Sequence, residues 1–323
     1  MKRFKGYFFN LVFIWAAVAI YRNAEYYVNF LSYETQGTIL LLAASYTVLG
    51  FFFYLRRKGV FTKTKGWLIF SFIKKVASRP LKSGTTKEER TAVLFAFVKF
   101  FYLPLMLNFF YGNAFAVIDG LRELSFSVFS IPYFNNVWFP FLVTLVFAVD
   151  TAYFAFGYAF EARFLKNKVR SVEPTFIGWF VALICYPPFN SATTRIVDWY
   201  ADIYIYAPDD FSTFLLRLSI LLLLGIYLSA TLALGAKSSN LTNRGIVSFG
   251  PYRYIRHPAY VSKNLAWWLS LLPVMSWPAA FSMASWSLIY HARAITEERH
   301  LMKDKEYKHY CRKVRYRYFP GIY

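Results

Sequence analysis

The chain has 323 residues, of which 57% are hydrophobic, 22% aromatic and only 17% charged. A soluble domain is roughly 45–50% apolar and about 25% charged, so this composition excludes an ordinary water-soluble globular protein. The net charge of +20 would suit nucleic acid, but the basic residues are divided among several loops between apolar runs. This distribution favours anionic lipid headgroups as the partner of the basic loops, and we expect no nucleic-acid partner.

The apolar runs predict an all-α, polytopic integral membrane protein, because a helix needs roughly 20 mostly apolar residues to cross a bilayer. In chain order the expected spans are 7–21, 38–55, 91–118, 136–160, 174–190 and 214–234, followed by a proline-broken helical hairpin within 262–292. This gives about 7–8 transmembrane helices, with a cytosolic helical tail after them. Residues 67–73 are too short to cross, and we expect them to lie in the membrane interface.

The first 22 residues resemble a signal peptide, since basic residues precede a short apolar run. The many later apolar runs favour a retained first helix, with cleavage as the alternative. Two cysteines cannot form a disulfide framework, and we expect Cys185 and Cys311 to be free thiols.

The charges of the loops predict one orientation in the membrane. The loops 56–90, 161–173 and 235–263 are rich in lysine and arginine, whereas 189–213 holds one arginine and four aspartates. By the positive-inside rule, the amino terminus, residues 235–263 and the carboxyl-terminal tail face the cytoplasm.

Three ionisable residues interrupt the expected spans, and a charge inside a bilayer is costly. Lys99 and Arg217 are long enough to extend to the membrane surface. The shorter Asp150 either forms a structural pair or faces a substrate cavity.

The turn at residues 250–264, GPYRYIRHPAYVSKN, is the first candidate site. All the histidines lie in this turn or after it: His257, His291, His300 and His309. Gly250 and the proline after it interrupt the preceding structure, and Pro258 disfavours the α region for His257. Arg256 and His257 should therefore project from an extended turn before a helix restarts.

The chemistry of this turn suits a nucleotide-like ligand. Backbone amides at a helix start, together with Arg256, suit a carboxylate or phosphate. Tyr252, Tyr254 and Tyr260 offer flat rings against which a purine can stack. The alternative is a basic patch that binds lipid headgroups.

A second cluster at residues 293–298 contains Glu297 and Glu298 side by side. Adjacent helical residues point about 100° apart, so the two carboxylates cannot share one face. We expect Glu297 to pair with Arg293 at i,i+4 and Glu298 to face the membrane-side groove, where it binds a cationic ligand. The alternative is a solvated helix with routine ion pairs. We interpret the two clusters as halves of one site at a membrane surface.

Together these motifs resemble the isoprenylcysteine carboxyl methyltransferase and phospholipid methyltransferase superfamily, over about residues 231–323. The resemblance is carried by Arg256-His257-Pro258-Ala259-Tyr260, the helical hairpin, Glu297-Glu298, Leu301, Tyr307 and Tyr310. Members are integral membrane enzymes that use S-adenosylmethionine. The chain departs from the family where a Phe-Gly pair often lies, so Leu301 and Tyr307 are close in sequence.

The resemblance implies a membrane-embedded methyltransferase-like module at 231–323. Residues 1–230 show no such likeness, and their apolar runs predict an N-terminal transmembrane bundle of unassigned role. It implies that the cofactor is wrapped by Tyr252, Arg256, His257, Pro258 and Tyr260 and met at its amino-acid end by Glu297 and Glu298. Arg293 looks like the arginine that positions the acceptor. The acceptor would be lipophilic, either an isoprenylcysteine-like carboxylate or a lipid, and no metal is expected.

Two other functions are open. The carboxyl end, residues 310–311 and 316–323, also looks like membrane sterol reductases, which use NADPH and share the Arg-His-Pro turn but usually lack a Glu-Glu pair. Carboxylates suit a sulfonium with a free ammonium, whereas the extra phosphate of NADPH requires cations, so the glutamates favour methyl transfer. A transporter or scaffold is the third alternative, but three ionisable residues are sparse for a solute pathway.

Overall fold

The computed structural model describes residues 4–56, 64–78, 84–128, 130–201, 204 and 206–322. Lys2, Arg3, Asp202 and parts of the basic loop 56–90, on which some charge arguments depend, lie outside the described residues. The protein is 75% helical with almost no sheet, which confirms the all-α prediction. The chain divides into two compact units, Met1–Tyr111 and Gly112–Tyr323.

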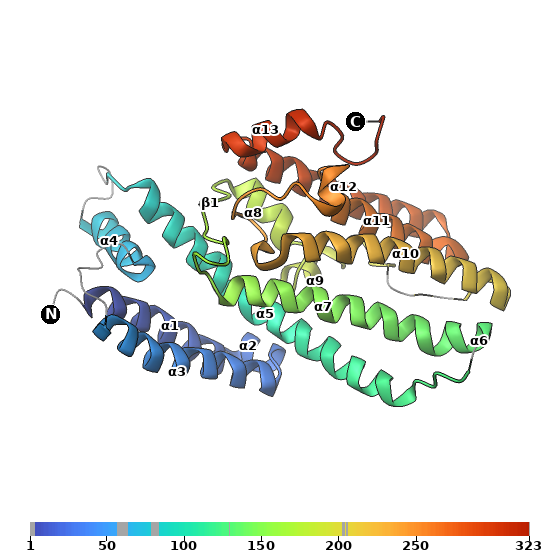
Figure 1. Ribbon diagram of the computed structural model, residues 1–323, viewed down its shortest axis with the longest axis horizontal. Helices are drawn as coiled ribbons and strands as arrows, with labels where there is room; N and C mark the ends of the chain where they lie inside the picture. Colours follow the sequence, from blue (N-terminus) through green and yellow to red (C-terminus); the bar gives the residue numbers. More distant parts are fainter. Residues whose placement is uncertain are drawn as a thin grey trace. The chain divides into compact units, whose positions relative to one another are not determined.

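The first unit is built from helices packed around α1 (Figure 1). Its elements are α1 (Lys5–Asn23), α2 (Glu25–Phe30), α3 (Tyr33–Arg56), α4 (Lys65–Ser78) and the first part of α5 (Lys87–Glu123). Asn10 in α1 joins its neighbours, because its amide donates to the Tyr46 hydroxyl at 2.6 Å and accepts from the Gly66 N–H at 2.7 Å. A Cβ on Gly66 would lie 2.5 Å from the Asn10 backbone nitrogen, so only glycine allows α4 to approach this closely.

In the second unit α10 lies beside α7 and α11 (Figure 1). The elements are α6 (Ile131–Tyr133), the π-helix η2 (Phe134–Trp138), α7 (Phe139–Ala159), β1 (Ser171–Val172), α8 (Phe176–Leu183), α9 (Phe189–Thr193), α10 (Asp210–Leu234), η3 (Gly235–Lys237), β2 (Thr242–Asn243), η4 (Gly250–Arg253), α11 (Pro258–Leu271), η5 (Leu272–Val274), α12 (Trp277–Leu301) and α13 (Lys305–Lys313). A buried cluster joins α7, α10 and α11: Phe139, Val143, Ile220, Leu224 and Ala266.

A short antiparallel pair connects two loops of this unit. Ser171 of β1 pairs with Asn243 of β2, and Val172 pairs with Thr242. The loop that follows α7 is thereby fixed against the loop that follows α10.

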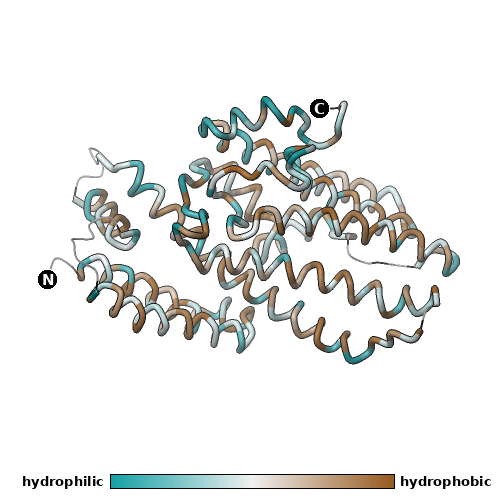
Figure 2. The backbone as a smooth tube through the Cα atoms, in the orientation of Figure 1, coloured by the Kyte–Doolittle hydropathy of each residue, from teal (hydrophilic) through white to brown (hydrophobic). Residues whose placement is uncertain are grey.

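Among the described residues, four segments are long and apolar enough to cross a membrane: Tyr33–Arg56, Lys87–Glu123, Ile131–Ala159 and Asp210–Lys237. Figure 2 shows hydrophobic residues along α7 and α10 and hydrophilic residues along α13. The prediction of one span at 174–190 is wrong. The helix α8 has 8 residues and ends at Leu183. At 1.5 Å per residue it covers about 12 Å, far less than a bilayer core of roughly 30 Å.

The break after α8 has a local cause in Pro187 and Pro188, which cannot donate the backbone hydrogen bonds that would continue the helix. The short helix α9 follows directly after them. The hairpin of α11 and α12 is present as predicted, whereas the total of about 7–8 spans stays a prediction.

Two of the three ionisable residues within the apolar helices, Asp150 and Arg217, are buried inside the protein. Arg217 is 6% exposed and donates to the backbone carbonyls of Asn135 and Tyr204, the second at 2.9 Å. The expectation that Arg217 extends to the membrane surface is therefore wrong, because buried carbonyl groups hold its guanidinium. Asp150 is 6% exposed and accepts a hydrogen bond from the Thr231 hydroxyl at 2.6 Å, so it forms the structural pair. Lys99 is half-buried, and its extension to the membrane surface stays a prediction.

Candidate functional site

The turn before α11 has the predicted conformation. Gly250 has a φ of 60°, a left-handed value that favours glycine, and it ends the preceding segment. His257 has φ −124° and ψ 56°, outside the α region, and α11 begins at Pro258. Proline fits the first position of a helix because its missing N–H would have no partner there.

The backbone amides of this turn are occupied by the carboxyl-terminal tail. The N–H of Arg256 donates to the Tyr316 carbonyl and the N–H of His257 donates to the Arg317 carbonyl, each at 3.0 Å. These two N–H groups are therefore not available to a ligand, because the tail carbonyls accept from them. The binding of a carboxylate or phosphate by the amides at the start of α11 stays a prediction.

The tail itself packs around two tyrosines of α13, despite the short spacing from Leu301 to Tyr307. Tyr307 and Tyr310 are buried in one cluster, against which Leu301 and Tyr252 pack. The Tyr310 hydroxyl donates to the Tyr252 carbonyl at 2.7 Å, which fixes α13 to the turn. The cysteines Cys185 and Cys311 are both free, as predicted.

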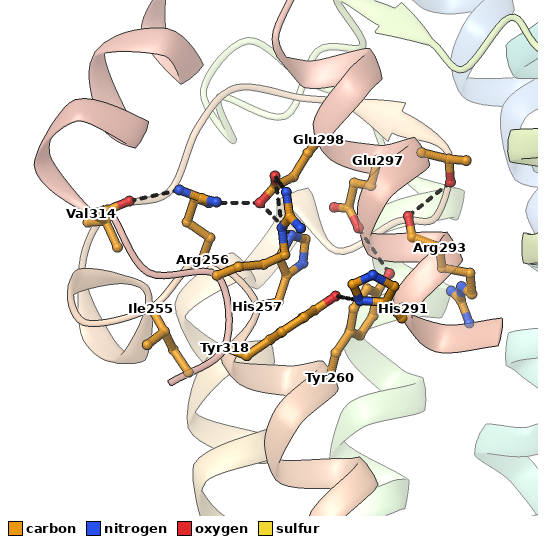
Figure 3. Close-up of polar contacts among 12 residues, drawn as sticks. Ile255, Arg256, His257, Tyr260, His291, Arg293, Glu297, Glu298, Val314 and Tyr318 are labelled. Atoms are coloured by element: carbon orange, nitrogen blue, oxygen red, sulfur yellow. Dashed lines mark hydrogen bonds and ion pairs between the residues drawn. The ribbon is translucent and has the colours of Figure 1, made fainter. Parts of the chain in front are cut away.

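Glu298 connects the turn, α12 and the tail (Figure 3). Its Oε1 is 2.7 Å from Arg256 Nε and 3.1 Å from His257 Nε2, and its Oε2 is 2.8 Å from Arg317 Nη2. Burial alone would raise the pKa of this carboxyl, but the hydrogen bonds from His257 and Arg317 outweigh burial and hold the pKa well below its usual range. The buried, charged carboxylate of Glu298 therefore links α12 to the turn and to the tail.

Glu297 has the opposite environment. It is exposed, lines a cavity, and accepts a hydrogen bond from the Tyr260 hydroxyl at 2.9 Å. The Tyr260 ring stacks on the His257 ring, with centroids 5.3 Å apart and planes 13° from parallel. The predicted environments of the two glutamates are thus reversed, since ion pairs enclose Glu298 and Glu297 lines the cavity. The separation of about 100° around the helix holds, but the residues of the turn and tail enclose Glu298, which leaves Glu297 at the cavity.

Arg293 does not form the predicted pair with Glu297. It is buried, and its Nη2 donates to Asn240 Oδ1 at 3.2 Å. Its guanidinium lies 5.1 Å from the Tyr290 ring centroid and 5.5 Å from that of Tyr260, distances at which a cation is attracted to a ring face. A buried cation held by an amide and aromatic rings is suited to an anionic or polar group of a ligand.

The cavity has a volume of about 150 Å³, roughly ten times the 10–15 Å³ that one water needs in the same measure. Six of the eight predicted site residues line it: Tyr252, Arg256, His257, Tyr260, Arg293 and Glu297. Pro258 and Glu298 are buried outside the cavity. The two sequence clusters therefore converge on one space, as predicted. The exposed ring of Tyr254 takes no part in its wall.

Sequence reasoning missed much of the rest of the wall. Glu173 follows β1, and Gly178 belongs to α8. His300 also lines the cavity, and its Nε2 lies 2.8 Å from Ser171 Oγ. Burial lowers the pKa of His300, which keeps its ring neutral at pH 7.

Lys263 of α11 is another missed cavity residue, and its ammonium lies 5.0–5.2 Å from the ring centroids of Phe147, Tyr227 and Trp267. Thr175, a helix-capping residue before an apolar run, did mark the start of a helix just after Glu173. No sequence signal placed this segment at the turn.

This is a helical membrane protein with a cavity of about 150 Å³ beside a hydrogen-bonded turn. Residues 213–308, from α10 into α13, match the phospholipid methyltransferase family. This segment is a domain of the isoprenylcysteine carboxyl methyltransferase and phospholipid methyltransferase superfamily, as predicted, and it indicates a membrane methyltransferase. A comparison with curated proteins finds none that matches the chain.

Proposed function

We propose that the protein is an S-adenosylmethionine-dependent methyltransferase that acts at the membrane on a lipophilic acceptor. The observation that carries this proposal is the convergence of the 250–260 turn and Glu297 of α12 on one cavity, within a phospholipid methyltransferase domain.

The cavity residues fit this cofactor by their chemistry. The Glu297 carboxylate suits a cationic group, and the rings of Tyr252 and Tyr260 suit a purine. When bound, S-adenosylmethionine supplies a methyl group on a positively charged sulfur. We assign cofactor binding to Tyr252, Arg256, His257, Tyr260 and Glu297. Pro258 and Glu298 support this wall from outside the cavity, because they set the turn and hold it to α12.

The side chains of the site position the reactants and exclude water, and they do little acid–base chemistry. Methyl transfer is an in-line displacement, so aligning the two reactants and excluding water account for most of what the side chains must do. Arg293 holds an anionic or polar group of the acceptor, because it is buried in the cavity wall and its guanidinium is held by Asn240 and aromatic rings.

The acceptor reaches the site from the bilayer, and the cofactor enters from the cytoplasm. The apolar helix α10 contributes Tyr227, Thr231 and Leu234 to the cavity wall, which supports lateral entry of a lipid or an isoprenylcysteine-like carboxylate. The positive-inside rule supports a cytoplasmic site and cytoplasmic termini. We assign the methyltransferase module to residues 231–323 and leave residues 1–230 as an N-terminal transmembrane bundle of unassigned role.

Ligand binding tests this function directly. The purified protein in detergent is melted alone, with S-adenosylhomocysteine and with NADPH. A ligand that binds only the folded protein stabilises it by about 2.7 kcal/mol at 100 times its Kd, so S-adenosylhomocysteine should raise the Tm. Stabilisation by NADPH and none by S-adenosylhomocysteine would refute the proposal in favour of the reductase.

A matched pair of variants adds specificity. Glu297→Gln should weaken S-adenosylhomocysteine binding in calorimetry. Glu306→Gln is the control, because Glu306 is 59% exposed and pairs with Arg170 outside the cavity.

A further inference from the structure

A carboxylate from outside the matched family segment reaches the cavity. Glu173 lies in the loop between α7 and α8, directly after β1, and residues 213–308 do not include it. Its backbone N–H donates to the Leu241 carbonyl at 2.8 Å, which extends the β1–β2 pairing. This pairing holds Glu173 against the loop after α10, and its side chain lines the cavity.

The two oxygens of this carboxylate differ in their partners. Oε1 accepts from the Thr175 N–H at 3.0 Å and lies 3.3 Å from Arg299 Nη2. Oε2 is buried and has no hydrogen-bond partner among the described residues. Nδ1 of His300 lies 4.0 Å from Oε2, beyond hydrogen-bond distance. One oxygen is therefore anchored while the other is unsatisfied.

The surrounding chain is built to hold this side chain in place. A Cβ on Gly178 would lie 2.3 Å from Glu173 Cγ, so the carboxylate lies directly on the backbone of α8. Thr175 caps α8 by accepting from the Gly178 N–H at 3.2 Å. The Trp179 indole donates to the Glu173 carbonyl at 2.7 Å. This many local contacts leave the side chain, which is 3% exposed, little freedom to turn to water.

A buried carboxylate oxygen without a partner is unfavourable, and it is satisfied when a cation or a hydrogen-bond donor enters the space in front of it. Glu173 lies beside Arg299, whose side chain is 47% exposed, so this end of the cavity is close to water. A water-soluble ligand is therefore the partner that reaches it, in preference to a lipid.

We infer that Glu173 binds a cationic group of S-adenosylmethionine, as a second carboxylate beside Glu297 that the segment between α7 and α8 supplies. This inference rests on the proposed function, because it needs that cofactor in the cavity.

The test is calorimetry on the full-length protein in detergent with three ligands that differ in charge. S-adenosylmethionine carries a sulfonium and an ammonium, S-adenosylhomocysteine only the ammonium, and methylthioadenosine neither. Glu173→Gln should weaken binding of S-adenosylmethionine by about tenfold or more, the loss expected for a charge-assisted contact. Binding of methylthioadenosine should not change. A loss shared by S-adenosylhomocysteine assigns the contact to the ammonium, and a loss confined to S-adenosylmethionine assigns it to the sulfonium.

Two results would overturn the inference while the proposed function stands. Either all three affinities stay at the wild-type values, or all three fall alike, which would mean that Glu173 only shapes the cavity. A wild-type protein that binds none of the three would overturn the proposed function itself. Glu306→Gln is the charge-matched control. If Glu173→Gln does not fold, Glu173→Asp keeps the charge but withdraws it by one methylene, and the same selective loss is expected from it.

Discussion

The adjacent residues Glu297 and Glu298 should respond in opposite ways to the same substitution. Glu298 is enclosed by Arg256, His257 and Arg317, whereas Glu297 is exposed at the cavity and bonded to Tyr260 (Figure 3). Glutamine has nearly the same shape as glutamate and lacks its charge. Glu298→Gln should therefore reduce stability, and Glu297→Gln should reduce cofactor affinity.

The expected sizes follow from the two environments. The Glu298 side chain is 8% exposed and those of Arg256 and Arg317 are 13% exposed, so the substitution removes a charge that two largely buried guanidinium groups share. Breaking a buried ion pair on one side costs about 3–5 kcal/mol. Because the amide oxygen still accepts one hydrogen bond, we expect a loss near the lower end, about 3 kcal/mol. Glu297→Gln, at an exposed position, should change stability by no more than about 0.5 kcal/mol.

The assay is a pair of measurements on each variant in the same detergent. Thermal or denaturant unfolding gives the stability change, and calorimetry with S-adenosylhomocysteine gives the affinity. Glu297→Gln should lose about tenfold or more in affinity, as expected for a hydrogen bond to a charged group. Equal stability of the two variants, or a larger loss of stability for Glu297→Gln, would refute the inference that Glu298 links the turn, α12 and the tail. Glu306→Gln again serves as the surface control.

Three further predictions use other parts of the second unit. Gly178→Ala should destabilise the protein and weaken S-adenosylmethionine binding together, because the added methyl displaces Glu173; unchanged calorimetry would contradict this. Burial lowers the folded-state pKa of His300, so its contribution to stability is present above the unfolded value of about 6.5 and is lost as pH falls through the folded pKa. The Tm difference between wild type and His300→Gln should accordingly shrink from pH 7 to pH 5, and a constant difference would exclude this contribution. Arg217→Met should cost about 1–3 kcal/mol per buried carbonyl left without a donor, measured by unfolding in detergent, and a neutral effect would show that these carbonyls find other partners.

Local rules predicted the turn well because its conformation depends on its own residues. Proline restricts the residue before it, so His257 is outside the α region and α11 starts at Pro258, as expected. The convergence of the turn with α12 was also predicted, from the resemblance to a membrane methyltransferase superfamily.

Which glutamate faces the cavity was not predictable from helical spacing. The i,i+4 rule considers only residues of the same helix. The partners that decided the outcome, Arg317 for Glu298 and Asn240 for Arg293, come from other segments. Similarly, the mean hydropathy of 174–190 suggested one span, because such an average does not register the interruption of the helix by Pro187 and Pro188.

The contacts between the turn and residues 316–317 determine when the turn can complete its hydrogen bonds during synthesis. The turn at Arg256 receives its backbone partners from residues 316 and 317, so its hydrogen bonding is complete only after the ribosome has added these residues, about 60 positions later. A nonsense mutation at position 314 would leave the four apolar segments found among the described residues able to insert, yet deprive the turn of its acceptors. Such a product should accumulate in the membrane as an inactive form.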